Sequence, residues 1–248
     1  MNNKYNAQRS RNLFRSNVEK PFKLSRSKIE DFLYCPRCFY LDRKCGTDQP
    51  PSFPFTLNTA VDTLLKKEFD KYRTEGTAHP LLIKHGIDAI PFFHPDLDDW
   101  RMNFKGIQHL HEPTNFIITG AIDDLWINSK GELIVADYKA TSTSKEIVLR
   151  QALKNQIELY QWLLRQKGFA VSSTGYFVYC NADTMKEGFE GKLEFEISLI
   201  PYEGDDSWIA KTLGAIRECL VTQTIPTSSG PCDFCAYLTA VRSHLTNG

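Results

Sequence analysis

Two pairs of cysteines near opposite ends of the chain constrain its fold more than any other feature. Cys35 and Cys38 form one Cys-x-x-Cys pair, and Cys232 and Cys235 form a second pair close to the other end. A two-residue gap lets a tight turn direct two thiolates at one metal ion, and two such turns complete a tetrahedral site. The spacing therefore predicts that a metal ties the two ends of the chain together. The plainer alternative is four buried free thiols.

Length and composition indicate a globular protein and exclude several other classes. The chain has 248 residues, enough for one well-buried domain or one domain with a smaller appendage, and 42% of them are hydrophobic. No apolar run approaches the roughly 18 residues of a membrane-spanning helix, and no apolar segment follows the first basic residues as a secretory signal requires. We therefore expect a cytoplasmic protein with no membrane contact. In that reducing compartment seven cysteines favour metal binding or burial over disulfides.

A balanced net charge conceals a basic N-terminus. The whole chain has 30 basic and 30 acidic residues, but residues 1–30 contain eight basic and two acidic ones. A basic arm on an acidic body is suited to contact with a polyanion, although a solvated tail has the same composition. We expect an arm over residues 1–23, a main domain over residues 24–240 and a short tail over residues 241–248.

The apolar periodicity predicts helices and strands in alternation. Helices are expected at 24–44, 56–72, 143–167 and 207–221, and the third begins with a capping-box pattern at Thr143–Glu146. Strands are expected at 132–139, 176–180 and 193–200, and 116–127 is expected to form one strand or a bent pair of strands. A proline-rich connector covers 50–54. The alternation predicts a mixed α/β fold.

Two aspartates are placed where neighbouring strands can bring them together. The turn at 128–131 folds the strands around it into a hairpin, which can bring Asp123 alongside Asp137. Side chains two residues apart in a strand share a face, so Asp137 and Lys139 point the same way. Paired carboxylates suit Mg²⁺ or Mn²⁺, and a nearby lysine can help to deprotonate an attacking water. This pattern indicates phosphodiester hydrolysis, whereas the plainer alternative is a solvated salt bridge.

The predicted helix 143–167 carries a polar residue on its apolar face. Gln156 falls near the middle of that stripe, where a buried amide is costly unless it is hydrogen-bonded. It could reach a catalytic water, the lysine or the substrate, or it could be a core amide satisfied by a peptide group. Arg150 and Lys154 on the same helix are candidates for phosphate contacts.

In order and spacing, these residues resemble the motifs of the PD-(D/E)XK nucleases. The matching segments are Gly120-Ala-Ile-Asp123, Val135-Ala-Asp137-Tyr-Lys139 and Gln156-Ile-Glu-Leu-Tyr160. The chain is most similar to the RecB-type branch, which includes the AddB nuclease domain and the CRISPR-associated RecB-like exonucleases. The Tyr34–Leu41 segment resembles the N-terminal Cys-Pro helix of that branch. The resemblance implies a restriction-endonuclease-like core, in which helices flank a central mixed β-sheet.

The resemblance also implies roles for individual residues. Asp123, Asp137 and the Tyr138 carbonyl would ligate the Mg²⁺ or Mn²⁺ ion, Lys139 would be the catalytic lysine, and Gln156 and Tyr160 would form the helix motif. Where the family has a histidine on the early helix, this chain has Asp62, an oxygen ligand that can replace it. Periodicity instead places Glu68 nearer the apolar stripe of that helix.

The cysteines depart from the family pattern of one near the N-terminus and three near the C-terminus. Cys35, Cys38, Cys232 and Cys235 still provide the four thiolates of a [4Fe–4S] cluster, which the resemblance favours. Two symmetrical Cys-x-x-Cys pairs are equally typical of structural Zn²⁺.

Together these features predict a metal-dependent deoxyribonuclease, either an exonuclease or an endonuclease, with RNA as the alternative substrate. We expect it to act on single-stranded DNA or DNA ends in repair, recombination or defence, with helicase, CRISPR or repair proteins as partners. One alternative is a non-catalytic nucleic-acid-binding or scaffold subunit that keeps the fold. Another is a zinc-linked interaction domain with a purely structural acidic pair.

Overall fold

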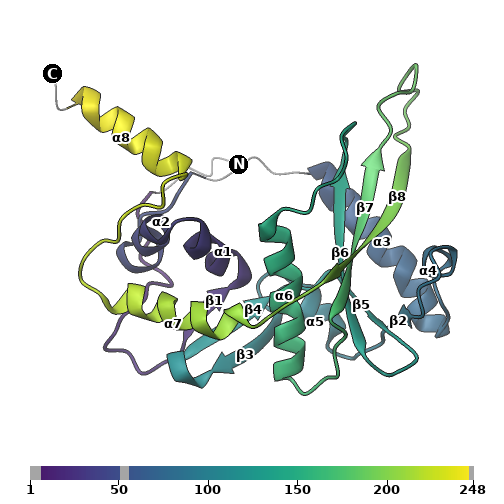
Figure 1. The fold of residues 1–248 in the computed structure, drawn as a ribbon, viewed down its shortest axis with the longest axis horizontal. Helices are drawn as coiled ribbons and strands as arrows, with labels where there is room; N and C mark the ends of the chain where they lie inside the picture. The colour runs from purple at the N-terminus through teal and green to yellow at the C-terminus, as the bar shows by residue number, and fades with distance from the viewer. Residues whose placement is uncertain (1–6, 51–55, 246–248) are drawn as a thin grey trace. The chain divides into compact units, whose positions relative to one another are not determined.

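The computed structural model describes residues 7–50 and 56–245, which form two compact units. Unit 1 combines residues 1–53, 110–118 and 207–248, whereas unit 2 combines residues 54–109 and 119–206. Figure 1 shows the order of their helices and strands along the chain. The first six residues of the expected basic arm, most of the proline-rich connector and the last three residues of the expected tail lie outside the described residues.

Unit 2 is built on a five-stranded mixed sheet with the strand order β2-β5-β6-β7-β8. Its strands are β2 (Ile90–Pro91), β5 (Asp124–Ile127), β6 (Leu133–Thr141), β7 (Thr174–Ala182) and β8 (Phe195–Glu203). Its helices are α3 (Thr56–Glu75), α4 (Pro80–Lys84), α5 (Leu97–Arg101) and α6 (Gln151–Gln166). Strands β6 and β7 are parallel, so the chain must cross over between them, and α6 forms that crossover. The predicted mixed α/β fold is confirmed.

Strand β6 is the centre of the unit 2 core. Its residues from Leu133 to Tyr138 are buried, as the continuous apolar run predicted for a strand covered on both faces. Tyr138 lies in one apolar cluster with Leu65 and Phe69 of α3. Asp137 points to the other face, where it meets α6. Helices α3 and α6 therefore cover opposite faces of this strand (Figure 1).

The helix predicted from residue 143 begins only at Gln151. The capping-box prediction is wrong because the backbone of Thr143 is bonded elsewhere. Its N–H donates to Asn181 Oδ1 over 2.9 Å, and its carbonyl accepts from Asn181 Nδ2 over 3.0 Å. These bonds hold residue 143 against the end of β7. Residues 144–150 therefore form a loop that leads from there to the start of α6.

The segment 116–127 forms two strands in two different sheets. Strand β4 (Phe116–Gly120) belongs to a three-stranded sheet of order β1-β4-β3, whereas β5 belongs to the five-stranded sheet. Strands β4 and β3 (Ile107–His111) each run from one unit into the other. Between β4 and β5, the N–H of Ile122 donates to the carbonyl of Trp100 over 3.1 Å and leaves the strand ladder.

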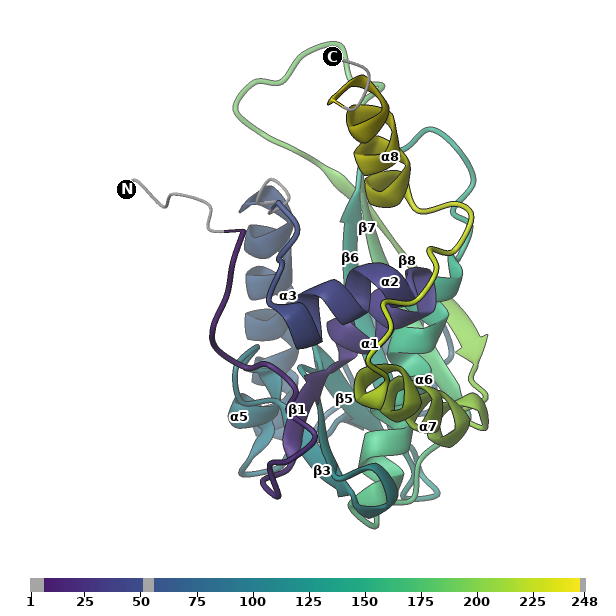
Figure 2. The same cartoon turned by 90° about the vertical axis from the view of Figure 1, so that its left-hand side faces the viewer.

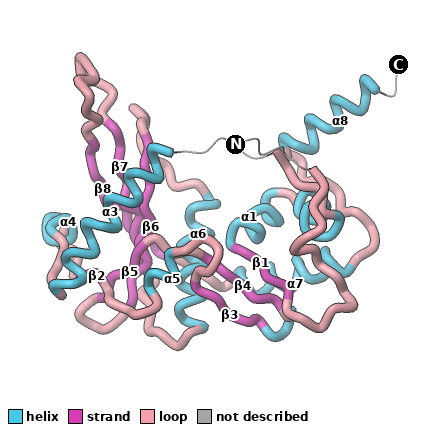
Figure 3. The backbone as a smooth tube through the Cα atoms, turned by 180° about the vertical axis from the view of Figure 1, so that it is seen from behind, coloured by secondary structure: helices cyan, strands magenta, loops and turns pink. Residues whose placement is uncertain are grey.

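Unit 1 contains mostly short helices. They are α1 (Arg26–Tyr34), α2 (Pro36–Tyr40), a π-helical turn (Leu41–Cys45), a 3₁₀ turn (Glu112–Thr114), α7 (Trp208–Val221) and α8 (Asp233–Leu245), with strand β1 (Phe22–Ser25). Figure 2 shows α1, α2 and α7 packed together, and Figure 3 shows the long loop from α7 to α8. The predicted helix 24–44 breaks at Cys35, which is extended with φ −157°. Proline disfavours helical backbone in the residue before it, and Pro36 then starts the next helix.

Helix α8 continues to Leu245, so residues 241–245 of the expected tail are helical. The longest helix of the described residues is α3, whose 20 residues include many charged side chains. Within residues 7–50 and 56–245, no helix combines the length and the apolar character needed to span a membrane.

Candidate active site

Asp123 and Asp137 meet across the β5–β6 hairpin. The antiparallel register pairs Asp124 with Ala136, which places Asp123 beside Asp137 at the end of the ladder. The backbone N–H of Tyr138 donates to Asp123 Oδ2 over 3.0 Å and holds that carboxylate in place. Asp137 is fully buried. The hairpin predicted from the turn at 128–131 is present and brings the two carboxylates together.

Lys139 follows on the same face of β6. Its ammonium forms an ion pair with Asp137 Oδ2 and donates to the carbonyl of Tyr138 over 3.5 Å. The Lys139 side chain is about one quarter exposed, unlike the carboxylate that it contacts. The pair is therefore one buried anion and one cation at the edge of a cavity.

Gln156 of α6 binds the buried aspartate directly. Its Nε2 donates to Asp137 Oδ1 over 2.7 Å and to the hydroxyl of Tyr160 over 3.2 Å. This contact explains the polar residue in the apolar stripe, and a core amide bound only to peptide groups is not what the structure contains. A Cβ at Gly120 would lie 2.5 Å from the Tyr160 ring, so a glycine is needed there for that ring to pack. The matched segments thus form one connected network.

Asp62 lines the same cavity of about 560 Å³ as Asp123 and Lys139. The cavity is lined by the start of α3, by Asp123 and by Tyr138 and Lys139 of β6. Glu68 is elsewhere: its side chain is about half exposed, and its Oε1 lies 3.1 Å from His79 Nε2. The periodicity that favoured Glu68 fails because the carboxylate extends away from the cavity while Leu65 and Phe69 pack on the sheet. Asp62, the residue that the motif match selects, lies in the cavity lining.

Lys66 was not predicted as a site residue. Its Nζ lies 2.8 Å from Asp62 Oδ1 and 3.4 Å from Asp123 Oδ1, so one ammonium joins the carboxylate on α3 to the one that precedes β5. The spacing of Asp62 and Lys66, four residues apart on one helix, was the available signal. The three carboxylates are not packed as tightly as metal ligands. In the described ranges, the only group of three or more candidate ligand side chains within 4.8 Å of one another is the cysteine group.

Asp124 was also missed. This fully buried carboxylate forms ion pairs with Arg73 and Arg101 and accepts a hydrogen bond from the Tyr138 hydroxyl over 2.6 Å. Arg101 also donates from Nε to the carbonyl of Asp123 over 3.1 Å. Two consecutive aspartates at a strand start were the signal. Asp124 supports the hairpin, because one of its partners, Arg101, also holds the backbone carbonyl of Asp123.

The family comparison agrees with this geometry. A family model for the PD-(D/E)XK nuclease superfamily matches residues 23–240, which is most of the chain. The chain belongs to this superfamily. PD-(D/E)XK proteins are typically nucleases that hydrolyse phosphodiester bonds and use Mg²⁺ or Mn²⁺.

Other comparisons add little to the PD-(D/E)XK assignment. No curated protein matches the chain. Among solved structures, the crystal structure of SSO0001 shares 13% identity with a TM-score of 0.39 and covers 86% of this chain and 81% of that chain. A likeness at that level carries no argument about the site.

The residues of the PD-(D/E)XK site suit a divalent cation. Burial, and next the charge of Asp123, raise the pKa of Asp137, while Lys139 opposes them. Asp137 Oδ2 is buried and, within the described residues, has no hydrogen-bond partner beyond its ion pair with Lys139. A hard cation beside these oxygens would relieve the repulsion between the carboxylates. The donor types, although not their present spacing, therefore fit the metal that is typical of the superfamily.

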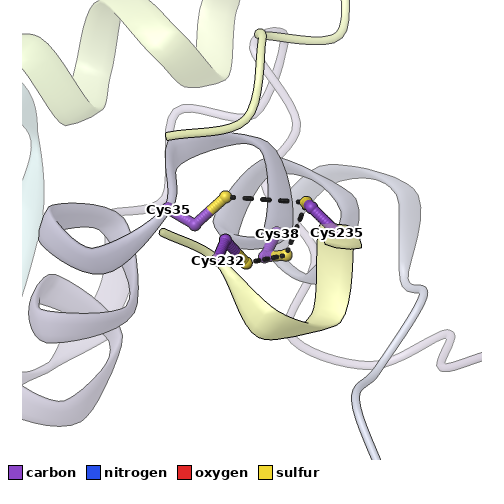
Figure 4. A group of neighbouring side chains, drawn as sticks. All are labelled: Cys35, Cys38, Cys232 and Cys235. Atoms are coloured by element: carbon purple, nitrogen blue, oxygen red, sulfur yellow. Dashed lines mark hydrogen bonds between the residues drawn. The ribbon is translucent and has the colours of Figure 1, made fainter. Parts of the chain in front are cut away.

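A second candidate metal site of this PD-(D/E)XK protein is the cluster of four cysteines in unit 1 (Figure 4). Cys38 Sγ lies 3.5 Å from the sulfurs of both Cys232 and Cys235, and Cys35 Sγ lies 3.9 Å from that of Cys235. All four are buried and none is in a disulfide. The two pairs thus come together from both ends of the chain, as their spacing predicted.

The cysteine cluster fits one tetrahedral ion. In a tetrahedral site, Zn–S bonds of about 2.3 Å place neighbouring sulfurs about 3.8 Å apart, which is close to the sulfur–sulfur distances observed here. In a [4Fe–4S] cluster each thiolate binds a different iron, which requires a wider cage. Hydrogen bonds from Cys38 and Ser229 overcome burial and lower the pKa of Cys35, whereas burial raises that of Cys38. Ionising all four thiols therefore requires a cation among them.

Proposed function

We propose that this protein is a metal-dependent deoxyribonuclease of the RecB/AddB type, similar to the CRISPR-associated RecB-like exonucleases. Its substrate is single-stranded DNA or DNA ends, in repair, recombination or defence. Membership of the superfamily supports phosphodiester hydrolysis. The observation that carries the proposal is the convergence of Asp123, Asp137 and Lys139 at the cavity of unit 2.

The metal would be held by Asp123, Asp137 and the Tyr138 carbonyl, with Asp62 in the lining of the same cavity. When bound, Mg²⁺ or Mn²⁺ supplies a Lewis acid that stabilises the charge developing on the phosphate. Gln156 donates to one oxygen of Asp137, which fixes the plane of that carboxylate and directs its other oxygen away from α6. The buried side chain therefore keeps one orientation.

Lys139 would act on the attacking water and on the negative charge that develops at phosphorus. Its ammonium is held beside Asp137 yet is partly exposed to the cavity, where it can bind an attacking water and the phosphate oxygens. An ammonium in this position offsets the negative charge that grows at phosphorus. Arg150 and Lys154 were the other expected phosphate contacts. Lys154 Nζ lies 5.6 Å from the centre of the Tyr202 ring, which gives it an aromatic support.

Cleavage of labelled single- and double-stranded DNA and RNA in Mn²⁺ tests the proposal. Asp137→Ala and Lys139→Ala should each reduce cleavage by about 10³-fold or more while DNA affinity stays within a few-fold. Glu68→Ala is the matched control, because that carboxylate lies on the same helix as Asp62 but outside the cavity. Full activity of either cavity variant would refute the mechanism. Asp62→Ala should behave like Asp137→Ala.

A non-catalytic nucleic-acid-binding subunit is the second candidate. It is favoured by Asp62 in place of the family histidine and by Lys66, whose ammonium occupies the space between two of the expected ligands. This alternative predicts that the wild-type protein binds the oligonucleotides and leaves them intact at every Mg²⁺ or Mn²⁺ concentration.

For the cysteine cluster we propose a structural Zn²⁺ held by Cys35, Cys38, Cys232 and Cys235, in place of the [4Fe–4S] cluster that the family resemblance favours. The spacing of the four sulfurs supports a single ion. Anaerobically purified protein should be colourless near 400 nm and contain one zinc per chain. A brown protein with about four irons would reverse this assignment.

A further inference from the structure

The described part of the basic N-terminal segment is ordered, and several cations of residues 7–30 fall into two sets. One set holds the arm to unit 1. Arg9 forms an ion pair with Asp42, and Lys28 Nζ lies 3.0 Å from the same carboxylate. The backbone adds further bonds, from the N–H of Arg9 to Gly46 and from the N–H of Phe14 to Arg43. These contacts place residues 9–14 against the helices of unit 1.

The second set of cations lines a cavity of about 370 Å³ within unit 1. Arg15, Lys20 and Lys23 come from the arm and the start of β1, and Arg217 comes from α7. None of the described residues that line this cavity is acidic. Four positive charges therefore face one concave surface, and the arm is more than a solvated tail.

An aromatic cluster supports the cavity and orients one of the cations. Phe14 is buried and packs edge-on against Phe22 and Phe116, with ring centres 5.5 and 6.4 Å away. The guanidinium of Arg217 lies over the Phe14 ring, 5.1 Å from its centre. A guanidinium is planar and carries its donors in a fixed fork that matches two oxygens of a phosphate, and the contact with Phe14 restrains where that fork lies.

We infer that this cavity is a second phosphate-binding site, which binds the sugar–phosphate backbone of single-stranded nucleic acid. Its cations come from the N-terminal segment and from α7 and surround one cavity. Successive phosphate groups of a nucleic-acid strand could therefore each bind one of these cations. Lys and Arg residues clustered around a cavity whose described lining contains no acidic residue favour a polyanion over a metal or a neutral ligand. The choice of nucleic acid as the polyanion rests on the proposed nuclease function. The site lies in unit 1, whereas the carboxylate site lies in unit 2.

Fluorescence anisotropy with a labelled single-stranded oligonucleotide tests the inference. It is done without added Mg²⁺ or Mn²⁺, so that binding is measured independently of cleavage. Arg15→Glu/Lys20→Glu should weaken binding by about 10-fold or more and make the affinity less dependent on salt. Arg11→Glu/Lys211→Glu is the matched control: both residues are exposed cations of unit 1 outside the cavity lining, and the change in net charge is the same. The control should lose no more than about 3-fold.

Equal weakening by the two double variants would overturn the inference, because it would show that only overall charge matters. Unchanged binding by the cavity variant would overturn it too. Arg217→Lys keeps the charge but loses the planar fork, and we expect a loss of about 3-fold with an unchanged melting temperature. A wild-type protein that binds through the cavity but never cleaves would refute the proposed nuclease and leave this site standing. If the wild-type protein cleaves DNA and the cavity variant binds it as tightly as the wild type, the nuclease proposal would stand and this second site would be refuted.

Discussion

The carboxylate site of unit 2 and the cysteine cluster of unit 1 differ in how their acidic groups are compensated. The carboxylates have cations of their own, because Lys139 pairs with Asp137 and Lys66 joins Asp62 to Asp123. The four thiols contact one another at 3.5–3.9 Å. The first site is therefore partly compensated by the chain's own cations, whereas the second needs a metal before its thiols can all ionise.

The two sites also differ in the part of the sequence that forms them. One β-hairpin brings Asp123, Asp137 and Lys139 together, and only Asp62 and Gln156 come from flanking helices. The cysteine cluster joins residues about 200 positions apart. Closing so long a loop costs more chain entropy, and metal binding supplies the free energy that offsets it. Loss of metal should therefore affect stability at the cluster and activity at the carboxylates.

The largest expected effect is on the cluster. Cys232→Ser should remove the proposed Zn²⁺ and lower the free energy of unfolding by about 3 kcal/mol or more, because binding of a structural metal contributes directly to folding. Metal content per chain and thermal unfolding measure this effect. Cys45→Ser is the control, since that thiol is exposed and outside the cluster. A Cys232→Ser protein as stable as the control would remove the difference between the sites.

The next effect separates a catalytic role from a structural one. Gln156→Leu should reduce metal-dependent cleavage by about 10- to 100-fold, because Asp137 loses the donor that fixes its orientation. The readout is the rate of cleavage against Mn²⁺ concentration. Gln166 is exposed at the end of the same helix, so Gln166→Leu is the control and should leave the cleavage rate unchanged. Equal rates for the two variants would show that Gln156 does not position the ligand.

A smaller effect concerns the stability of the metal-free protein. Burial and the charge of Asp123 raise the pKa of Asp137 to about 7 from an ordinary 3.8. Asp137 therefore stabilises the fold below about pH 4 and loses that contribution as pH rises to about 7. Asp137→Asn should match the wild type at pH 4 and exceed its stability by about 1 kcal/mol or more at pH 8. A pH-independent difference in chemical unfolding would contradict this expectation.

The smallest effect tests the cation already in the carboxylate site. Lys66→Ala should raise the affinity for Mn²⁺ by about 3- to 10-fold, because a metal would no longer compete with an ammonium for Asp62 and Asp123. Titration calorimetry measures this affinity directly. Lys67→Ala is the adjacent exposed control. Weaker Mn²⁺ binding by Lys66→Ala would mean that this lysine stabilises the arrangement that the metal binds.

Local patterns predicted a large share of the fold and of the site. The apolar run of β6, the turn after β5 and the stripe of α6 each follow from residues close in sequence, so the hairpin and Gln156 were found at their observed places. Predictions failed where a distant partner decided the backbone. Residues 143–150 are a loop because Asn181 binds Thr143. Glu68 lies outside the cavity. Periodicity did not predict this, because it identifies the apolar face of α3 but not which part of the helix borders the cavity.

Residue types and spacing were enough to identify the superfamily motifs, the cysteine pairs and the basic arm, because each depends on chemistry within a few residues. Other features became visible only when the folded chain brought its segments together. Lys66 reaches Asp123, two arginines neutralise Asp124, and Arg217 joins three cations of the arm around one cavity. Burial and charge compensation depend on distances between segments far apart in the chain. Those distances are set by packing, which no local pattern of residues contains.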